Sequence, residues 1–206
     1  MTAKAAERFG ADGLLAVTPY YNKCTQNGLV AYYKAICESV SIPVIAYNVP
    51  GRTGVEIQPA TMAKIAEIPN IAGIKDAGGN MSKTMETLRL VNDKCDVYSG
   101  EDALNFPILA CGGVGVISVL SNIVPADVKK LCTLIKEGKL EEAIVLNNKL
   151  LPLANACFVE VNPIPVKAAM AALGYCDNFV RGPLVPMEGE PYEKMLSVMR
   201  EYGLNV

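Results

Sequence analysis

One lysine occupies an unusual position for a charged residue. Lys75 lies near the end of an apolar run, residues 71–77, that has the length and composition of a short buried strand. Burial of an ammonium group is costly, so a lysine in such a place tends to give up its proton. A neutral amine attacks carbonyl carbons and forms an imine. Lys75 is therefore a candidate Schiff-base nucleophile, and the alternative is a strand-end charge that reaches water.

A tyrosine in the preceding strand-like run is placed to work with this lysine. Tyr47 lies in residues 43–50, and adjacent parallel strands run about 4.8 Å apart. Side-chain alternation puts Tyr47 and Lys75 on one face, so the phenol and the amine are expected to meet. The chain contains no histidine, which leaves proton transfer to tyrosine, lysine, cysteine or carboxylates. Tyr47 is a candidate proton shuttle, with a strand aromatic that caps a loop as the alternative.

Four further side chains are weighed on position. Arg52 lies in the Pro-Gly-Arg-Thr-Gly segment just beyond a strand end, and it either clamps a substrate carboxylate or forms a surface ion pair. Tyr20 and Tyr21 follow the first strand-like run and form either a subunit contact or a wall of the site. Lys167 is the other lysine in an apolar setting, but it lies on a predicted helix and ranks below Lys75.

Strand-like and helix-like segments alternate along most of the chain. Apolar runs without polar alternation indicate strands buried on both faces, and hence a parallel sheet with helical crossovers. The predicted strands are residues 13–19, 43–50, 71–76, 96–100 and 115–119. The predicted helices are residues 2–9, 29–36, 59–68, 82–92, 108–109, 125–136, 141–157, 163–173 and 191–202. We therefore predict a β/α region over residues 1–138 and a C-terminal helical region over residues 139–206.

Two folds are compatible with five β/α units. A closed (β/α)8 barrel needs eight strands and about 250 residues, so five units correspond to the last five-eighths of a barrel. An open doubly wound sheet is complete with five strands. In both folds, function gathers at the carboxyl ends of the strands. The glycine-rich stretch 112–115 precedes its strand, so we interpret it as a tight turn and not as a phosphate loop.

Composition limits the classes of function. With 206 residues, of which 51% are hydrophobic, the chain can bury a sizeable core in one or two domains. A net charge of -2 gives no electrostatic case for a nucleic-acid or membrane partner, and no apolar run is long enough to span a bilayer. The N-terminal residues lack an apolar signal core, and the 7 scattered cysteines are typical of free thiols. These features predict a cytoplasmic protein.

Several segments together resemble the dihydrodipicolinate synthase family, within the N-acetylneuraminate lyase superfamily. The matching segments are residues 17–22, 47–54, 73–77, 113–118 and 162–167. Segment 47–54 is specific, because sister lyases and sugar-acid aldolases share the lysine and the tyrosine but as a rule lack the arginine-containing loop. The resemblance implies an α/β fold, a partial TIM (β/α)8 barrel made of the last five β/α units with a C-terminal helical extension.

The resemblance also implies an activity, the condensation of pyruvate with L-aspartate 4-semialdehyde in lysine and diaminopimelate biosynthesis. Lys75 would carry pyruvate as a covalent imine, so neither a cofactor nor a metal would be needed. Tyr47 would shuttle protons, and Arg52 would bind the semialdehyde carboxylate. Gly100 and Ile117 would form part of the wall of the site.

The resemblance also implies that a second subunit contributes to the active site. Tyr21 would reach across a tight dimer interface into the active site of the partner subunit. In the family that dimer usually pairs again into a tetramer, so self-association as a dimer of dimers is expected for the full-length family. Tyr20 is the one plausible remnant of a lysine-feedback site.

The sequence departs from the family at its N-terminus. The family has a Gly-Thr-Thr-Gly-Glu segment, one threonine of which links two tyrosines in a proton relay and helps bind the pyruvate carboxylate. This sequence contains no such segment. We therefore expect an N-terminally truncated chain with little synthase activity by itself, because three missing strands would leave unpaired sheet edges.

Two alternatives stay open beside the synthase. One is a sister class I lyase or aldolase that acts on 2-keto-3-deoxy sugar acids or on N-acetylneuraminate. The other is an inactive fragment of the synthase.

Overall fold

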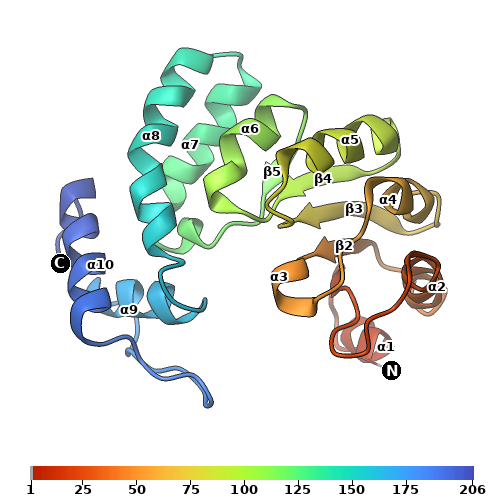
Figure 1. Cartoon of the computed structure of the whole chain (residues 1–206), viewed down its shortest axis with the longest axis horizontal. Helices are drawn as coiled ribbons and strands as arrows, with labels where there is room; N and C mark the ends of the chain where they lie inside the picture. The colour runs from red at the N-terminus through yellow and green to blue at the C-terminus, as the bar shows by residue number, and fades with distance from the viewer. Residues whose placement is uncertain (1) are drawn as a thin grey trace. The chain divides into compact units, whose positions relative to one another are not determined.

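Five parallel strands form one sheet in the order β1-β2-β3-β4-β5 in the computed structural model, which describes residues 2–206 (Figure 1). They are β1 (Leu14–Val17), β2 (Val44–Asn48), β3 (Ile71–Asp76), β4 (Asp96–Ser99) and β5 (Gly115–Val116). Each lies within a strand predicted from the sequence. The order of neighbours follows the order in the chain, which is the arrangement of consecutive β/α units in a barrel and not of a doubly wound sheet.

Helices connect these strands. Before or between them lie α1 (Thr2–Arg8), α2 (Gln26–Cys37), α3 (Pro50–Thr53), α4 (Pro59–Ile65), α5 (Met81–Val91) and α6 (Asn105–Ala110), with short 3-10 turns η1 (Asn92–Lys94) and η2 (Asp102–Leu104). After the sheet come the 3-10 turn η3 (Leu120–Asn122) and helices α7 (Pro125–Lys136), α8 (Leu140–Ala156), α9 (Ile164–Ala172) and α10 (Gly189–Tyr202). The C-terminal helical region predicted from the sequence is therefore present.

The chain divides into two compact units, Met1–Ile117 and Ser118–Val206. This division falls before the boundary at residue 138 that the sequence pattern suggested. Helix α7 directly follows the fifth strand in the sequence, so the sequence analysis assigned it to the β/α region. In the structure, α7 packs against α8 within the second unit. The fifth strand is also shorter than expected. A turn begins at Ser118, whose hydroxyl accepts a hydrogen bond from the backbone N–H of Ser121 at 2.9 Å.

The first unit buries one face of its sheet against helices. Val44, Ala46 and Ile74 belong to a buried apolar cluster that also contains Leu29 of α2 and Met62 of α4. Helices α2, α4 and α5 pack in succession over that face (Figure 1). Because strand side chains alternate, the residues between these core positions point to the opposite face of the sheet. That opposite face carries the candidate residues.

A buried polar network fixes the ends of β2 and β3 on the helix-covered face. The Asp76 carboxylate accepts hydrogen bonds from the Asn48 side-chain amide at 2.9 Å and from the Thr84 hydroxyl at 2.6 Å. It also accepts one from the Gly78 backbone N–H at 3.1 Å, and the side-chain Oδ1 of Asn48 accepts one from the Ile57 backbone N–H at 3.0 Å. Asp76 directly follows Lys75, so this network holds the strand end that presents the lysine.

Removal of one donor tests this network. Thr84→Val, which nearly preserves side-chain shape, is expected to lower the free energy of unfolding by about 1–3 kcal/mol, because it leaves a buried carboxylate short of one hydrogen bond. Ser82→Ala removes an exposed hydroxyl from the same helix and should change that free energy by less than about 0.5 kcal/mol. Urea denaturation of the three proteins measures both values. Equal stability of the Thr84 variant and the parent would contradict this role of the network.

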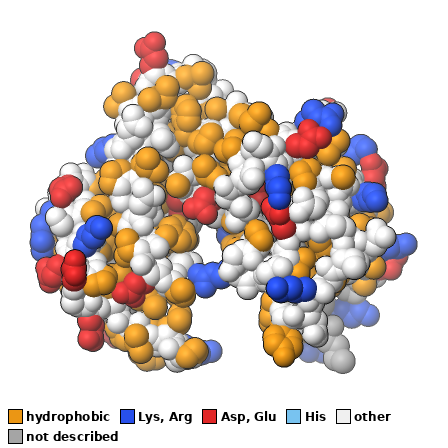
Figure 2. Space-filling model, viewed as in Figure 1, with side chains coloured by type: hydrophobic (Ala, Val, Ile, Leu, Met, Phe, Trp, Pro, Cys, Tyr) orange, Lys and Arg blue, Asp and Glu red, His pale blue; other side chains and the backbone are white. Residues whose placement is uncertain are grey.

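Charge is mixed on the surface of the protein. On the face shown in Figure 2, acidic and basic side chains are interspersed among apolar and uncharged ones. This pattern agrees with a net charge of only -2. Within residues 2–206, no helix combines the length and the apolar character that a membrane crossing requires.

Candidate active site

The lysine and the tyrosine expected to meet do lie together. Tyr47 on β2 and Lys75 on β3 are paired in register, so both side chains leave the sheet at the same level and on the same face. The Lys75 Nζ atom lies 4.2 Å from the centroid of the Tyr47 ring. Both side chains are half-buried. An amine and a phenol are thus held within reach of one small substrate at the carboxyl ends of two strands.

Burial alters the acidity of the lysine. It lowers the pKa of the Lys75 ammonium below its ordinary value, and the negative charge of Asp102 opposes that shift. Asp102 is itself buried and accepts a hydrogen bond from the Asn105 side chain at 2.9 Å. A lower pKa increases the fraction of neutral amine at any pH below about 10.4, the usual lysine value. Lys75 therefore has more nucleophilic character than a solvent-exposed lysine.

The pH dependence of imine formation follows from these charges. The rate of reaction with a small 2-keto acid should rise with pH and reach half its maximum below about pH 10.4, because only the neutral amine attacks. Asp102→Asn removes the charge that favours the ammonium, so the midpoint should move to lower pH. Asp96→Asn, the same change at the start of β4, should leave it in place. Borohydride trapping at a series of pH values measures the midpoint, and a shift to higher pH in Asp102→Asn would contradict the assignment.

The phenol is suited to donating a proton. Burial raises the pKa of the Tyr47 hydroxyl above its ordinary value, while the positive charge of Arg52 lowers it and the negative charge of Glu101 raises it. Burial likewise raises the pKa of the Glu101 carboxyl. Tyr47 is therefore protonated near neutral pH, and it faces both a cation and a carboxyl group. Such surroundings suit a group that gives up and regains a proton during a reaction.

A short helical turn presents Arg52. The segment expected to be a loop forms α3, in which Pro50 occupies the first turn and Gly54 ends the helix with a left-handed φ of 69°. Proline suits the first helical turn and glycine the left-handed position after it. The buried Thr53 hydroxyl accepts a hydrogen bond from Thr18 at 2.9 Å and ties the turn to the end of β1. The Arg52 side chain itself is exposed.

Gly100 gives the lysine the space it occupies. A Cβ atom at this position would lie 2.7 Å from Cε and 2.9 Å from Cγ of Lys75. The Gly100 backbone N–H also donates to the Asp76 carbonyl oxygen at 2.7 Å, so the backbone here is fixed to β3. The family resemblance implies that Gly100 forms part of the wall of the site, and in the structure Gly100 lies directly against the side chain of Lys75.

Substitution of this glycine should displace the lysine. Gly100→Ala is expected to slow imine formation by about tenfold or more, since a contact of 2.7 Å forces the Lys75 chain out of its position. Gly51→Ala is the matched control, because a Cβ there meets nothing within 4 Å. The rate of borohydride-dependent trapping measures the effect. An unchanged rate in Gly100→Ala would show that the close contact does not position Lys75.

The two remaining predicted residues lie at the edge of this arrangement. Tyr21 is 92% exposed and has a left-handed φ of 64°, so the chain presents its ring to solvent and does not pack it beside Lys75. Ile117 is half-buried, and its backbone N–H donates to the Ser99 carbonyl oxygen at 2.8 Å. This hydrogen bond continues the pairing of β4 with β5 by one residue, toward the carboxyl ends of the strands. Lys167 lies on α9 in the second unit.

Sequence reasoning assigned no role to four residues that shape this site: Asp102, Glu101, Thr53 and Asp76. Asp102 and Glu101 follow Gly100 at a strand end that the sequence marks as polar, but nothing in the pattern shows which group each one faces. Thr53 and Asp76 are buried polar residues whose partners lie far away in the chain. Alternation gave one usable signal, because Asp76 must point away from Lys75 and hence toward the helices.

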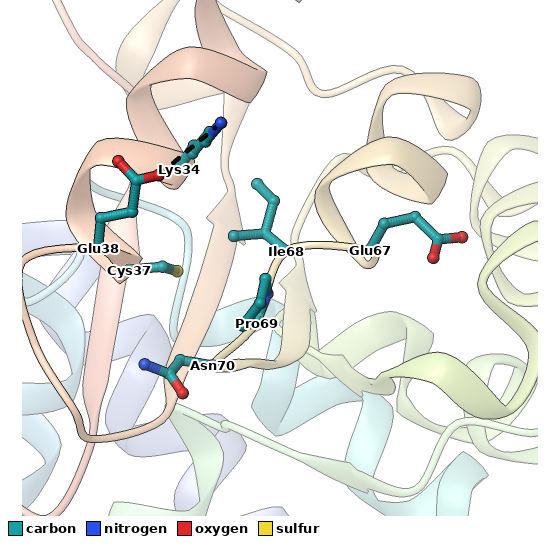
Figure 3. Close-up of a pocket in the computed structure, with 7 residues that line it drawn as sticks. All are labelled: Lys34, Cys37, Glu38, Glu67, Ile68, Pro69 and Asn70. Atoms are coloured by element: carbon teal, nitrogen blue, oxygen red, sulfur yellow. Dashed lines mark ion pairs between the residues drawn. The ribbon is translucent and has the colours of Figure 1, made fainter.

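A separate pocket lies at the opposite edge of the sheet, where the strands begin. It has a volume of about 470 Å³ and is lined by Lys34, Cys37, Glu38, Glu67, Ile68, Pro69 and Asn70 (Figure 3). Lys34 and Glu38 form an ion pair of 3.8 Å beside it. Burial raises the pKa of the Cys37 thiol, which makes it a weak nucleophile. This pocket lacks the paired chemistry that Tyr47 and Lys75 provide.

Within residues 2–206, no group of three or more histidine, cysteine, aspartate or glutamate side chains is arranged to hold a metal ion. The groups gathered at the strand ends are an amine, a phenol, a guanidinium and two carboxyls. Together they suit proton transfer and covalent chemistry on a small carbonyl compound.

Known proteins are similar to this chain in sequence and in fold. Residues 1–201 match the Dihydrodipicolinate synthetase family. A 4-hydroxy-tetrahydrodipicolinate synthase from Geotalea uraniireducens is 50% identical over 199 residues, which cover 97% of this chain and 69% of that protein. The crystal structure of a dihydrodipicolinate synthase from Acinetobacter baumannii complexed with pyruvate has a TM-score of 0.95 and 44% identity, over 98% of this chain and 69% of the other. The Thermotoga maritima enzyme gives 0.95 and 44%, over 98% and 70%.

Proposed function

Because this chain belongs to the Dihydrodipicolinate synthetase family, we propose that its strand-end site condenses pyruvate with L-aspartate 4-semialdehyde. The observation that carries the proposal is the half-buried Lys75 amine, with its lowered pKa, 4.2 Å from the Tyr47 ring. The names of the relatives favour the synthase over a sugar-acid lyase, because proteins about 50% identical to this chain are named as synthases.

The lysine performs the covalent part of this reaction. Its neutral amine attacks the ketone carbon of pyruvate, and loss of water leaves an imine between Nζ and that carbon. The protonated imine withdraws electrons, so a proton leaves the methyl group and an enamine forms. The enamine carbon attacks the aldehyde of the second substrate. The amine of that substrate then attacks the imine carbon, closes the ring and releases Lys75.

The surrounding residues position substrates and move protons. Tyr47 gives a proton to the leaving oxygen and takes one from the methyl carbon, which its protonated state and its neighbours Arg52 and Glu101 favour. Arg52 binds the carboxylate of the semialdehyde with paired hydrogen bonds. Gly100 and Ile117 form the wall beside the lysine. No separate cofactor takes part, because the imine itself serves as the electron sink.

The proposal includes the association of the chain with further copies of itself. The exposed Tyr21 ring enters the site of a second copy of the chain, and two such dimers associate as a tetramer. The left-handed backbone at Tyr21 and its 92% exposed side chain suit a residue that projects from its own subunit. The reaction takes place in the cytoplasm, where free cysteines persist.

A comparison of substrates tests the proposed function. The purified chain is incubated with pyruvate and L-aspartate 4-semialdehyde, and in parallel with a 2-keto-3-deoxy sugar acid or N-acetylneuraminate. Consumption of pyruvate that depends on the semialdehyde supports the synthase, even at a slow rate. Cleavage of a sugar acid without any condensation would overturn it. Trapping of pyruvate on the chain does not separate these cases, since both reactions begin with the same imine.

A further inference from the structure

One carboxyl group at the end of β4 contacts neither substrate in the reaction described above. It belongs to Glu101, which directly follows Gly100. The buried Ser99 hydroxyl donates to the Glu101 carbonyl oxygen at 3.0 Å and accepts a hydrogen bond from the Glu101 backbone N–H at 3.4 Å. The Gly100 backbone N–H is bonded to β3 at 2.7 Å. Hydrogen bonds on both sides of its Cα atom therefore hold Glu101 at the strand end.

The register of the sheet places this carboxyl group at the level of the reacting amine. Tyr98 pairs with Lys75, so Glu101 lies further along β4, toward the carboxyl ends of the strands. The Lys75 side chain extends in the same direction, because a Cβ atom on Gly100 would lie 2.7 Å from its Cε. Glu101 is half-buried there, and its negative charge acts on the Tyr47 hydroxyl. Glu101 therefore borders the same site as Lys75 and Tyr47.

The charges around the phenol suit a ligand that carries both signs. Tyr47 is influenced by the positive charge of Arg52 and by the negative charge of Glu101. Within residues 2–206, no lysine or arginine forms an ion pair with Glu101. Partial burial of a carboxylate is costly, and a cationic group of a ligand offsets that cost. An amino acid has one group for each of these two charges.

We propose that Glu101 binds the ammonium group of the second substrate and takes its proton before the ring closes. This inference rests on the proposed function, in which Arg52 binds the carboxylate of the same molecule, L-aspartate 4-semialdehyde. An ammonium is held by a carboxylate through short, charge-assisted hydrogen bonds. The contact also makes Glu101 a specificity residue, because an aldehyde without the nitrogen would leave the carboxylate unpaired.

The proton transfer prepares the nitrogen for the last step of the reaction. One N–H bond of the ammonium breaks and an O–H bond forms on the Glu101 carboxylate, so the nitrogen gains a free electron pair. That pair forms a C–N bond to the imine carbon, and the electrons of the C=N double bond move to the Lys75 nitrogen. After Lys75 has left, the proton on Glu101 passes to water and the carboxylate is restored.

Two aldehydes that differ only at this nitrogen test the inference. Succinic semialdehyde has the aldehyde and the carboxylate of L-aspartate 4-semialdehyde but no ammonium. Each is added to the protein with pyruvate, and proton NMR in deuterated water measures the concentration that halves the exchange of pyruvate methyl protons. Glu101→Gln should raise that concentration at least about tenfold for the aspartate compound and less than about threefold for the succinate compound. Glu101→Asp, which keeps the charge, should restore part of the difference.

Two controls separate this contact from a general effect on the site. Without any aldehyde, Glu101→Gln should change the exchange rate by less than about threefold, because Lys75 and Tyr47 are both retained. Glu38→Gln, the same substitution at an exposed position after α2, should leave all the values in place. Circular dichroism establishes that the variants are folded.

The outcomes distinguish this inference from the proposed function. An equal rise for both aldehydes in Glu101→Gln, or no rise for the aspartate compound, would overturn the role of Glu101. Condensation at the parental rate in Glu101→Gln would overturn it as well and leave the proposed function standing. If neither aldehyde affects exchange in the parent, the site does not take the second substrate, and both the proposed function and this inference fail.

Discussion

Replacement of Lys75 by arginine is expected to abolish the exchange of pyruvate methyl protons with solvent, a decrease of at least about 10³-fold. Arginine keeps the positive charge but is never neutral near physiological pH, so it cannot form the imine that makes the methyl protons acidic. Proton NMR in deuterated water measures the exchange, and this half-reaction needs no second substrate.

The control for this prediction is Lys167→Arg. Lys167 also lies in an apolar segment, on α9, and the same substitution there should leave the exchange rate unchanged. Retention of exchange in Lys75→Arg would show that another amine forms the imine. Loss of exchange in both variants would point to a structural effect of the substitutions.

Replacement of Tyr47 by phenylalanine should separate the two chemical steps. The exchange of methyl protons is expected to fall by about 10²–10⁴-fold, the usual contribution of a positioned proton-transfer group. Imine formation should still occur, because the Lys75 amine and its burial remain, but more slowly, because Tyr47 no longer gives a proton to the leaving oxygen. Exchange by NMR and trapping by borohydride are compared on the same preparation.

Tyr98→Phe is the matched control for that variant. Tyr98 is on β4 in register with Lys75, but its hydroxyl bonds to Asp96 at 3.1 Å, toward the start of the strand. Its loss should affect neither readout by more than about tenfold, because a group directed away from the amine transfers no proton to it. An equal decrease in both tyrosine variants would mean that ring packing, and not proton transfer, explains the role of Tyr47.

The sequence alone was sufficient to predict the strands of the sheet and the proximity of Tyr47 and Lys75. Short runs without regular polar alternation located all five strands, and strand alternation placed Tyr47 beside Lys75, as the register shows. Both inferences depend on local periodicity, which a single chain displays directly. The segment that contains Arg52 was expected as a loop but forms the short helix α3. Its helical form is supported by Gly54 and by the hydrogen bond that the Thr18 hydroxyl donates to the Thr53 hydroxyl.

What remained hidden depends on contacts distant in the chain. The opposing influence of Asp102 on Lys75, and the space that Gly100 leaves, arise only when β3 and β4 lie side by side. The buried Asp76 carboxylate accepts hydrogen bonds from Asn48 and Thr84. Asparagine and threonine are usually exposed, so their residue types alone do not predict that these two side chains are buried. The two compact units also divide at Ile117 and not at the predicted residue 138, since an amphipathic pattern shows that α7 has an apolar face but not which element covers it.

The most direct test of the catalytic assignment is to locate the trapped substrate. The unmodified chain is incubated with pyruvate, reduced with borohydride, digested and mapped by mass spectrometry. The account predicts a reduced pyruvate adduct on Lys75, with substoichiometric labelling elsewhere. A dominant adduct on Lys167 or on any other lysine, or no adduct at all on folded protein, would contradict it.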